Sequence, residues 1–283
     1  MKIAIAGYSG FIGKQFVLDR REDQIIPLPR KLLYGSVSEI AGAIRDADLV
    51  VNLAGSPINK RWTGKNKKII EESRFGVNSS LVEAINLLDK KPVQFITASA
   101  IGIYDTTGIH TEADHRLADN YLALVVKQWE KPLEKLHRAV SGTCLRIGVV
   151  LGRDGGVFPV MIRLSRLGML PVMGSGKQIF SFIHLDDLVG AMRWIISGKR
   201  KGVFNLCAPH PADNITFTRS LAKVRGVRFL FRMPSFVLKA GLGEAHIMLT
   251  EGPDVRPERL IQDGFTFRFP DIDSTVQNLV PKN

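Results

Sequence analysis

Cysteine is scarce in this chain of 283 residues, which has only Cys144 and Cys207. Two cysteines so far apart in the sequence exclude a disulfide framework and a cysteine-rich zinc site. We expect both to be small residues of the core. The expected compartment is therefore the reducing cytoplasm.

Long apolar runs are also absent. No stretch of about 18 uncharged apolar residues occurs, which is the length a membrane-spanning helix needs. The apolar first residues are interrupted by Gly7, Gly10 and Gly13, and no small-residue cleavage site follows them. We therefore expect neither a signal peptide nor a membrane span.

Positive charge is in excess, but it is not concentrated in one place. The formal net charge is +12, and the cations are spread over Lys60–Lys68, Lys199–Lys201 and single arginines from Arg219 to Arg232. A nucleic-acid-binding surface requires a basic patch or stripe. Nucleic-acid binding would rest on net charge alone, so we expect no nucleic-acid partner.

The first thirteen residues are the most informative segment that is present. Residues 3–6 have the pattern of a short buried strand, three glycines spaced three apart follow, and Phe11, Ile12, Phe16 and Val17 repeat with a helical period. Such glycines let backbone amides and a helix N-terminus approach a pyrophosphate. This order of strand, glycine turn and helix predicts a dinucleotide site.

The rest of the chain alternates between strand and helix patterns. This alternation predicts an α/β protein with a doubly wound parallel sheet, the Rossmann fold. Glycine and proline become frequent after about residue 152, which predicts a smaller lobe that forms a substrate pocket. The further strands are expected at 24–28, 48–55, 93–97 and 143–151, and the long helices at 71–88 and 121–138.

The residues that follow the second strand indicate the coenzyme. An NAD-specific fold has Asp or Glu at the end of this strand, whereas the 2′-phosphate of NADP(H) needs a cation there. Arg30 and Lys31 follow the strand, and the acidic residues around it precede it. We therefore expect NADP(H), and the alternative is that Arg30 is a solvated loop charge.

Three ordered motifs resemble those of the extended short-chain dehydrogenase/reductase superfamily. They are GYSGFIG at 7–13, NLAG at 52–55 and TASAIGIYD at 97–105. More narrowly, four segments are similar to an atypical group called epimerase family proteins: NLAGSPINKRWT at 52–63, ESR at 72–74, LRIGVVLGRDGG at 145–156 and GSGKQIFSFIHLDDL at 174–188.

The resemblance continues almost to the end of the chain, where residues 252–272 are similar to that group's small C-terminal domain of unknown function. It implies a nucleotide-binding domain over 1–235, a C-terminal domain over 236–283 and NADP(H) as the cofactor. Arg74 is a further candidate for the cofactor site, with an ordinary helix-surface arginine as the alternative. The other cofactor contacts implied by the resemblance are Gly7, Ser9, Gly10, Phe11, Ile12, Gly13, Arg30, Leu53, Ala54 and Gly55.

The YxxxK pair, which ordinary superfamily members use in catalysis, is missing. Its spacing puts both side chains on one helix face, where the lysine lowers the pKa of the tyrosine and holds the ribose. The residue four places after Tyr121 is Val125, and Lys127 lies about 120° away around a helix. No other tyrosine of the chain is followed by such a lysine.

Three hydroxyl groups remain as catalytic candidates. Ser99 lies where the superfamily has its carbonyl-polarising hydroxyl, and the alternative is a strand-end serine that satisfies the backbone. Tyr104 matches the tyrosine of the superfamily's VYG segment, and its expected role is to line the nicotinamide pocket or to pack the loop. Tyr121 is a proton donor if its helix is rotated.

Two clusters contain histidine. Residues 184–187 read as a strand followed by a helix, so they form either a proton relay or a helix cap made by Asp186 or Asp187, with His184 in the core. The loop that contains His110 and Glu112 has no recognised ligand spacing. We therefore expect no metal site.

Two functions remain open. The first is an NADP(H)-dependent oxidoreductase or nucleotide-sugar-type epimerase that acts on a small molecule. The second is a non-catalytic protein that senses NADP(H) or serves as a scaffold, for example in cell division, since a fold can be retained without the catalytic activity of its relatives. The sequence leaves the substrate, any protein partner and the oligomeric state open.

Overall fold

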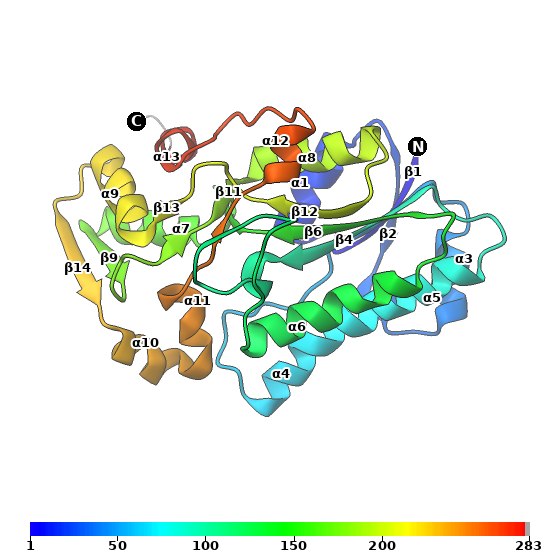
Figure 1. Ribbon diagram of the computed structural model, residues 1–283, viewed down its shortest axis with the longest axis horizontal. Coiled ribbons are helices and arrows are strands. Elements are labelled where there is room, and N and C mark those ends of the chain that lie inside the picture. Colours follow the sequence, from blue (N-terminus) through cyan, green and yellow to red (C-terminus); the bar gives the residue numbers. More distant parts are fainter. Residues whose placement is uncertain (281–283) are drawn as a thin grey trace.

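The structure is a computed structural model that describes residues 1–280, and its centre is a parallel sheet of six strands (Figure 1). Every neighbouring pair in this sheet is parallel. The predicted doubly wound fold is therefore confirmed. In spatial order the strands are β2 (Gln24–Leu28), β1 (Lys2–Ala6), β3 (Leu49–Asn52), β4 (Gln94–Ala100), β6 (Ser141–Ile147) and β12 (Gly202–Leu206).

Helices cover both faces of the sheet, and the alternation of side chains along each strand produces two separate core layers. Ile3 and Ile5 of β1 belong to one layer, whereas Ala4 and Ala6 belong to the other. In Figure 1 the first layer lies under α1 and α8, and the second faces α5. The covering helices are α1 (Phe11–Asp19) and α8 (Leu185–Ser197) on one face, and α3 (Val37–Ile44), α5 (Val77–Leu87) and α6 (Tyr121–Glu130) on the other.

The direction of winding reverses beside β1. The chain passes from β1 to β2 on one side and then crosses to β3 on the other side. A reversal of this kind opens a crevice at the carboxyl ends of the two central strands, where α/β proteins bind their ligands. The loops after β1 and β3 carry the glycine turn and the NLAG segment, so the fold brings both motifs to this crevice.

Several predicted elements have different bounds in the structure, and three of them differ in kind along part of their length. The helix predicted at 71–88 is the later part of a longer helical run, which begins with α4 (Gly64–Glu71) and continues through a π-helical turn, η1 (Glu72–Gly76), into α5. The predicted helix 121–138 ends at Glu130, and a 3-10 turn that contains Pro132, η3 (Lys131–Lys135), follows it. The predicted strand 143–151 divides at Gly148, where a side chain would meet the Ser181 carbonyl at 2.5 Å.

Most residues after β6, other than α8 and β12, form the smaller lobe that the sequence predicts. Phe158, Phe182 and Phe217 are at the centre of its core, and Val276 near the chain end belongs to the same core. The C-terminal residues thus pack into the lobe around them. The elements of the lobe are β7 (Val149–Gly152), β8 (Gly155–Gly156), α7 (Phe158–Arg166), β9 (Met169–Met173), β10 (Ile179–Phe180), β11 (Phe182–His184), β13 (Ala212–Asp213), α9 (Asn214–Arg225) and β14 (Phe229–Met233).

The remaining elements lie around the sheet and the lobe. In Figure 1 the orange and red C-terminal segments run along the lobe and back over the sheet. These elements are α2 (Arg30–Leu33), η2 (Ile101–Ile103), β5 (Ile109–His110), α10 (Ser235–Leu242), η4 (Gly243–His246), α11 (Ile247–Thr250), β15 (Asp254–Val255), α12 (Glu258–Gln262) and α13 (Ile272–Leu279).

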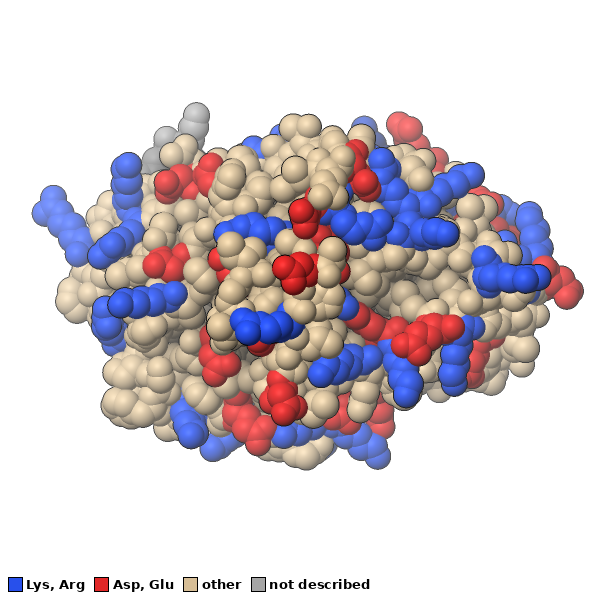
Figure 2. Space-filling model, viewed as in Figure 1, with Lys and Arg blue, Asp and Glu red and all other residues tan. Residues whose placement is uncertain are grey.

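The surface carries charges of both signs. On the face that Figure 2 shows, Lys and Arg side chains alternate with Asp and Glu over most elements. Helix length and hydropathy over residues 1–280 reveal no candidate for a membrane-crossing helix.

Candidate functional site

The glycine turn between β1 and α1 depends on two of its glycines for its shape. Gly7 has φ +81°, and a Cβ at this position would lie 2.5 Å from the Leu53 carbonyl oxygen. A Cβ on Gly13 would collide with the Gly7 carbonyl. Both glycines therefore let β1, α1 and the loop after β3 approach closely, whether or not a ligand is present.

The N-terminus of α1 opens at this turn. Its N-cap is Gly10, which has no side chain that could accept hydrogen bonds from the first-turn amides. Free amides and the helix dipole together favour an anion at this end. A cavity of about 290 Å³ lies here, and the expected cofactor residues on its wall are Gly7, Ser9, Gly10, Arg30, Leu53, Ala54 and Gly55.

Arg30 lies at the rim of this smaller cavity. It follows β2 as the first residue of α2 and is exposed. Its guanidinium carbon lies 5.4 Å from the centroid of the Tyr34 ring, which restrains the side chain beside the cavity. An exposed guanidinium in this place suits a phosphate group of a ligand.

Phe11 and Ile12, two further expected cofactor contacts of the turn, do not line the smaller cavity. The Phe11 ring occupies space that side chains at Gly152 and Gly155 would need, so it joins α1 to the smaller lobe. Ile12 lines a second, larger cavity. The turn that the sequence predicted therefore has two roles. Some of its residues line the cavities, and Phe11 packs the sheet against the smaller lobe.

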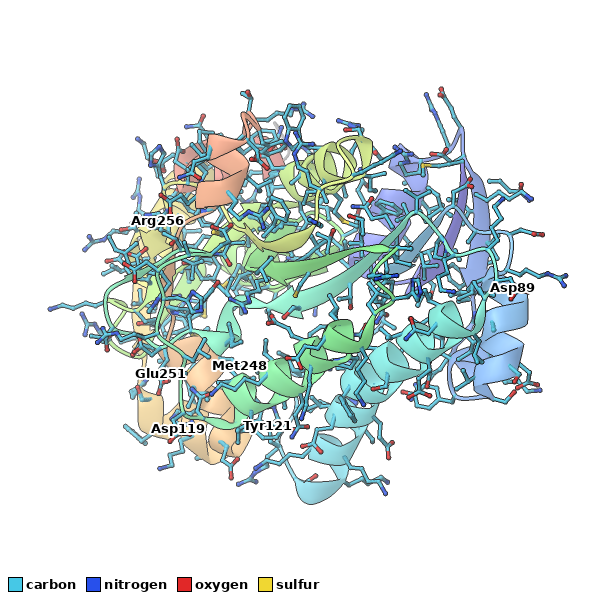
Figure 3. The ribbon with its side chains drawn as sticks, turned by 45° about the vertical axis from the view of Figure 1, so that its right-hand side comes forward. Asp89, Asp119, Tyr121, Met248, Glu251 and Arg256 are labelled. Atoms are coloured by element: carbon cyan, nitrogen blue, oxygen red, sulfur yellow. The ribbon has the colours of Figure 1, made fainter. Side chains whose placement is uncertain are left out.

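The larger cavity has a volume of about 550 Å³ and shares Leu53, Ala54 and Gly55 with the smaller one. Its walls come from the end of β4, from α6, from the smaller lobe and from the C-terminal segment. In Figure 3, Tyr121 at the start of α6 lies near Met248 of the C-terminal segment, and both pack against one apolar cluster. Both line this cavity, as does Glu251. The two cavities therefore adjoin each other at the loop after β3, along the carboxyl edge of the sheet.

Ser99 lies at the end of β4 on the wall of the larger cavity, and it is 3% exposed. Its hydroxyl donates a hydrogen bond of 2.6 Å to Oε1 of Glu130. Arg146 donates to both oxygens of the same carboxylate, at 2.9 and 2.7 Å. Because a hydroxyl has one proton, Ser99 presents acceptor lone pairs to the cavity.

Sequence reasoning missed Glu130, although one signal was present. Glu130 is the last residue of α6, where a negative charge opposes the helix dipole. An acid in that position points to a cationic partner, which is Arg146 from β6. The partner could not be identified from the sequence because the two residues meet only through the packing of α6 on the sheet.

Tyr104 lines the cavity but is tied into a buried hydrogen-bond network. Its hydroxyl donates to Asn205 Oδ1 at 2.7 Å and accepts from Arg146 at 2.8 Å. Burial raises the pKa of Tyr104, and the charge of Arg146 opposes this effect only in part. Tyr104 therefore lies buried on the cavity wall, and its place beside a nicotinamide stays a prediction.

Tyr121 begins α6 and lines the cavity from the side of α4. Its ring centroid lies 5.0 Å from that of Trp62, and its hydroxyl donates a long hydrogen bond of 3.4 Å to the Lys67 carbonyl oxygen. Burial raises the pKa of Tyr121 well above its usual value, and the charge of Glu71 raises it further. Val125, one turn along α6, is buried on the cavity wall where a YxxxK lysine would lie.

Arg74 lines the larger cavity but not the smaller one. It projects from η1, and its guanidinium carbon lies 5.0 Å from the centroid of the Trp129 ring. Burial lowers the pKa of Arg74 to about 10. The structure therefore separates Arg74 from Arg30, since each faces a different part of the site.

The cap predicted at α8 is made by a different residue. His184 Nδ1 accepts from the Asp186 amide at 3.0 Å, so His184 itself is the N-cap, and the prediction of Asp186 or Asp187 is wrong. Asp187 instead accepts from the amides of Arg268 and Phe269 and holds the C-terminal segment. His184 is 2% exposed, as expected for a core histidine.

The histidine loop shows no metal-binding arrangement. His110 accepts from the Arg116 amide and stacks on Tyr104 with ring centroids 5.3 Å apart. Glu112 accepts from the Asn205 amide, and burial raises its pKa. Within residues 1–280, no group of His, Cys, Asp and Glu has the arrangement of a metal site.

Known proteins resemble both the sequence and the fold. Residues 3–207 match the model of the NAD dependent epimerase/dehydratase family, and residues 233–279 match a domain of unknown function, DUF1731. The Epimerase family protein SDR39U1 homolog, chloroplastic, of Arabidopsis thaliana is 35% identical over 291 residues, which cover 95% of this chain and 84% of the relative.

Two further similarities concern a human protein. The Epimerase family protein SDR39U1 of Homo sapiens is 30% identical over 99% of this chain and 100% of its own. The crystal structure of human epimerase family protein SDR39U1 (isoform2) with NADPH has a TM-score of 0.92 and 28% identity to this chain, with 99% of each chain covered. The chain therefore belongs to the NAD dependent epimerase/dehydratase family, with relatives named epimerase family proteins and a DUF1731 domain after its family match.

Proposed function

We propose that this protein is an NADPH-dependent oxidoreductase that acts on a small molecule. The observation that carries the proposal is that the two cavities adjoin and share Leu53, Ala54 and Gly55 on their walls. The smaller cavity offers phosphate-binding groups, and the larger one is mostly apolar. This division suits a dinucleotide that meets its substrate at one end.

The residues of the smaller cavity fit the phosphates of NADPH. The open N-terminus of α1 suits the pyrophosphate, and Arg30 suits the 2′-phosphate. The human relative was crystallised with NADPH, which supports the same choice. NADPH, when bound, supplies a hydride to an electrophilic carbon.

The chain must then supply a proton to the oxygen of a reduced carbonyl group. Ser99 cannot do so directly because its proton is donated to Glu130. We assign the proton donor to Tyr121, which lines the same cavity and is protonated at neutral pH, as tyrosines ordinarily are. Its hydroxyl donates only a long hydrogen bond of 3.4 Å, to the Lys67 carbonyl oxygen, which a substrate oxygen can replace. Its raised pKa keeps this proton firmly bound. A phenol with a raised pKa is a weak general acid, so turnover is expected to be slow.

The test combines binding with turnover. Calorimetry on the purified full chain should show NADPH binding at least about tenfold tighter than NADH, since a charged hydrogen bond contributes about 1.5–3 kcal/mol. Among aldehydes and ketones, at least one should be reduced, and Tyr121→Phe should lower kcat about 100-fold or more without changing the Kd for NADPH. Failure to bind either coenzyme would exclude the proposal.

A second candidate is a non-catalytic NADPH sensor. Two observations favour it: Val125 occupies the position of the YxxxK lysine, and the proton of Ser99 is committed to Glu130. This alternative requires tight NADPH binding, no reduction of any carbonyl compound offered, and a protein partner whose capture depends on NADPH. Capture that does not respond to NADPH contradicts it.

The compartment is also a proposal. Cys144 and Cys207 are both unpaired and buried, and burial raises the pKa of each thiol, which keeps them unreactive. This is compatible with a reducing cytoplasm. The interspersed charges of Figure 2 support the expectation that nucleic acid is not a partner.

A further inference from the structure

Part of the wall of the larger cavity comes from the smaller lobe and the C-terminal segment. We call this part the outer wall, and it consists of the lining residues at 157–181, 214–217 and 247–253. Its large side chains are almost all apolar and belong to the cores of the lobe and of the cluster around Trp62. They include Met161, Met173, Phe180, Phe217, Ile247 and Met248.

The polar side chains of the outer wall hold the wall itself together. Gln178 Nε2 donates to the carbonyl oxygens of Met173 and Leu249, at 2.9 and 2.7 Å. Ser181 donates to the Pro253 carbonyl oxygen at 2.7 Å and accepts from a backbone amide at 3.1 Å. These hydrogen bonds join the lobe to the C-terminal segment, so little of their capacity is left for a ligand.

The two parts of the outer wall are also in close backbone contact. A Cβ on Gly252 would lie 1.9 Å from the Ile179 carbonyl oxygen, so only glycine permits this approach. On the lobe side, Asn214 Oδ1 accepts from the Met173 amide at 2.9 Å. The outer wall is therefore a fixed surface, and a ligand meets mainly its apolar side chains.

Charge is sparse around the larger cavity. Arg74 and Glu251 are the two charged residues among the described residues that line it. Arg74 lies at the junction with the smaller cavity, since a Cβ on Gly55, which lines both cavities, would lie 3.4 Å from its guanidinium. Glu251 is exposed and negatively charged. Among the described residues of the outer wall there is therefore no cation that could bind a phosphate or a carboxylate.

We infer that the substrate is an uncharged, mostly apolar aldehyde or ketone, whose carbonyl oxygen is its main polar group. This inference rests on the proposed function and names its substrate class. The carbonyl oxygen lies at Tyr121, and the apolar body lies against Trp62 and the outer wall, where Met248 is near Tyr121 in Figure 3. Reduction consumes the hydride of one NADPH and the proton of Tyr121, which solvent restores, and it yields an alcohol and NADP+.

A nucleotide sugar fits the outer wall poorly for two reasons. Its diphosphate would find no cation among the described residues of this wall, and Glu251 would repel it. Its sugar hydroxyls would leave water for side chains such as Gln178 and Ser181, whose hydrogen bonds are already made. An apolar body instead gains free energy roughly in proportion to the area that it removes from water.

The test measures binding to the full chain saturated with NADP+, so that ketones bind without being reduced. Three ketones share one chain and differ at the remote end: nonan-2-one ends in a methyl group, 8-hydroxyoctan-2-one in a hydroxyl and 8-oxononanoate in a carboxylate. Calorimetry should show Kd values that rise in this order, at least about fivefold for the hydroxyl and about 50-fold for the carboxylate. UDP-glucose should bind more weakly than nonan-2-one and than the aromatic ketone 4-phenylbutan-2-one.

Lysine substitutions locate this preference in the cavity. Met173→Lys and Met248→Lys each place a cation on the outer wall, so each should weaken nonan-2-one and should reduce or reverse its advantage over 8-oxononanoate. Met169→Lys, four residues earlier in β9 and outside the cavity, is the matched control and should leave the order and the differences unchanged. A thermal scan confirms that each variant is folded, and none should change the Kd for NADPH, since none lines the smaller cavity.

Three results would overturn the inference. 8-Oxononanoate would bind as tightly as nonan-2-one, or UDP-glucose would bind more tightly than the apolar ketones, or both cavity variants would leave the order and the differences of the parent unchanged. If the coenzyme binds but neither apolar ketone does, the substrate class is wrong and the proposed function stands. Failure to bind NADPH and NADP+ defeats the proposed function itself.

Discussion

The Ser99 hydroxyl donates to Glu130 over 2.6 Å, and the same carboxylate is held by Arg146. The side chains of Glu130 and Arg146 are only 17% and 8% exposed. The burial of Arg146 alone would lower its pKa, but the hydrogen bonds and charge of Glu130 raise it above its usual value. The ion pair thus fixes the hydroxyl at the cavity wall.

Glu130→Gln is expected to destabilise the protein because it leaves Arg146 buried without a counter-charge. The loss should be about 3 kcal/mol in the free energy of unfolding. Urea denaturation followed by circular dichroism measures it. Glu134→Gln, at an exposed position in η3, is the control and should change the stability by less than about 0.5 kcal/mol. Equal stability of the two variants would show that the ion pair contributes little.

The glycine turn offers a comparison between shape and ligand binding. Gly13→Ala should disrupt the turn because the added Cβ would collide with the Gly7 carbonyl. Relief of this collision requires a backbone shift, which costs stability. At Gly10 the added Cβ would lie 3.2 Å from the same oxygen, so Gly10→Ala should fold and should narrow the anion site. Thermal scans and NADPH titrations should show lost stability for the first variant and mainly lost affinity for the second.

Gly42→Ala is the control for the glycine variants. It lies inside α3 with no atom within 4 Å of an added Cβ, so it should stabilise the protein by about 0.5–1 kcal/mol through the helix propensity of alanine. The interpretation of the turn is wrong if Gly13→Ala has the same melting temperature as the parent protein and binds NADPH with the same Kd.

Arg30 tests the choice of coenzyme. If it binds the 2′-phosphate, Arg30→Ala should weaken NADPH binding about tenfold and leave NADH binding unchanged. The effect should decrease with added salt because Arg30 is exposed. Arg45→Ala, at an exposed position outside both cavities, should change neither Kd. An equal loss for both coenzymes would place Arg30 away from the 2′-phosphate.

The sequence predicted those parts of the site that depend on local order along the chain. The glycine turn, the strand before it and the helix after it are consecutive, so their spacing alone indicated the anion site at Gly10. Arg30 was found in the same way, as the residue after a strand. The family and its fold followed from motifs of this kind.

The sequence did not predict those parts of the site that depend on contacts between segments far apart in the chain, or on small local departures from regular geometry. Ser99 and Glu130 are 31 residues apart and meet only because α6 packs on the sheet. The π-helical turn at Arg74 was missed because one loosened turn hardly changes an apolar period. His184 was missed as a cap because capping preferences rank Asp, Asn, Ser and Thr first.

The cap at α8 makes stability depend on pH. Burial is the main cause that lowers the pKa of His184 in the folded protein, although the charges of Asp186 and Asp187 and the bond to Asn278 oppose it. The folded state therefore binds a proton less readily than the unfolded chain. The stabilisation by neutral His184 is fully present above the usual histidine pKa of about 6.5 and declines as the pH falls below that value.

A thermal scan from pH 8 to pH 5.5 should show this decline, because protonation of Nδ1 removes its ability to accept from the Asp186 amide. His184→Asn keeps an N-cap acceptor without a titratable group, so its melting temperature should change less over the same range. The exposed His137 serves as the control position, and His137→Asn should keep the parent's pH dependence. If His184→Asn loses stability toward pH 5.5 as steeply as the parent, another group that titrates near neutral pH causes the decline.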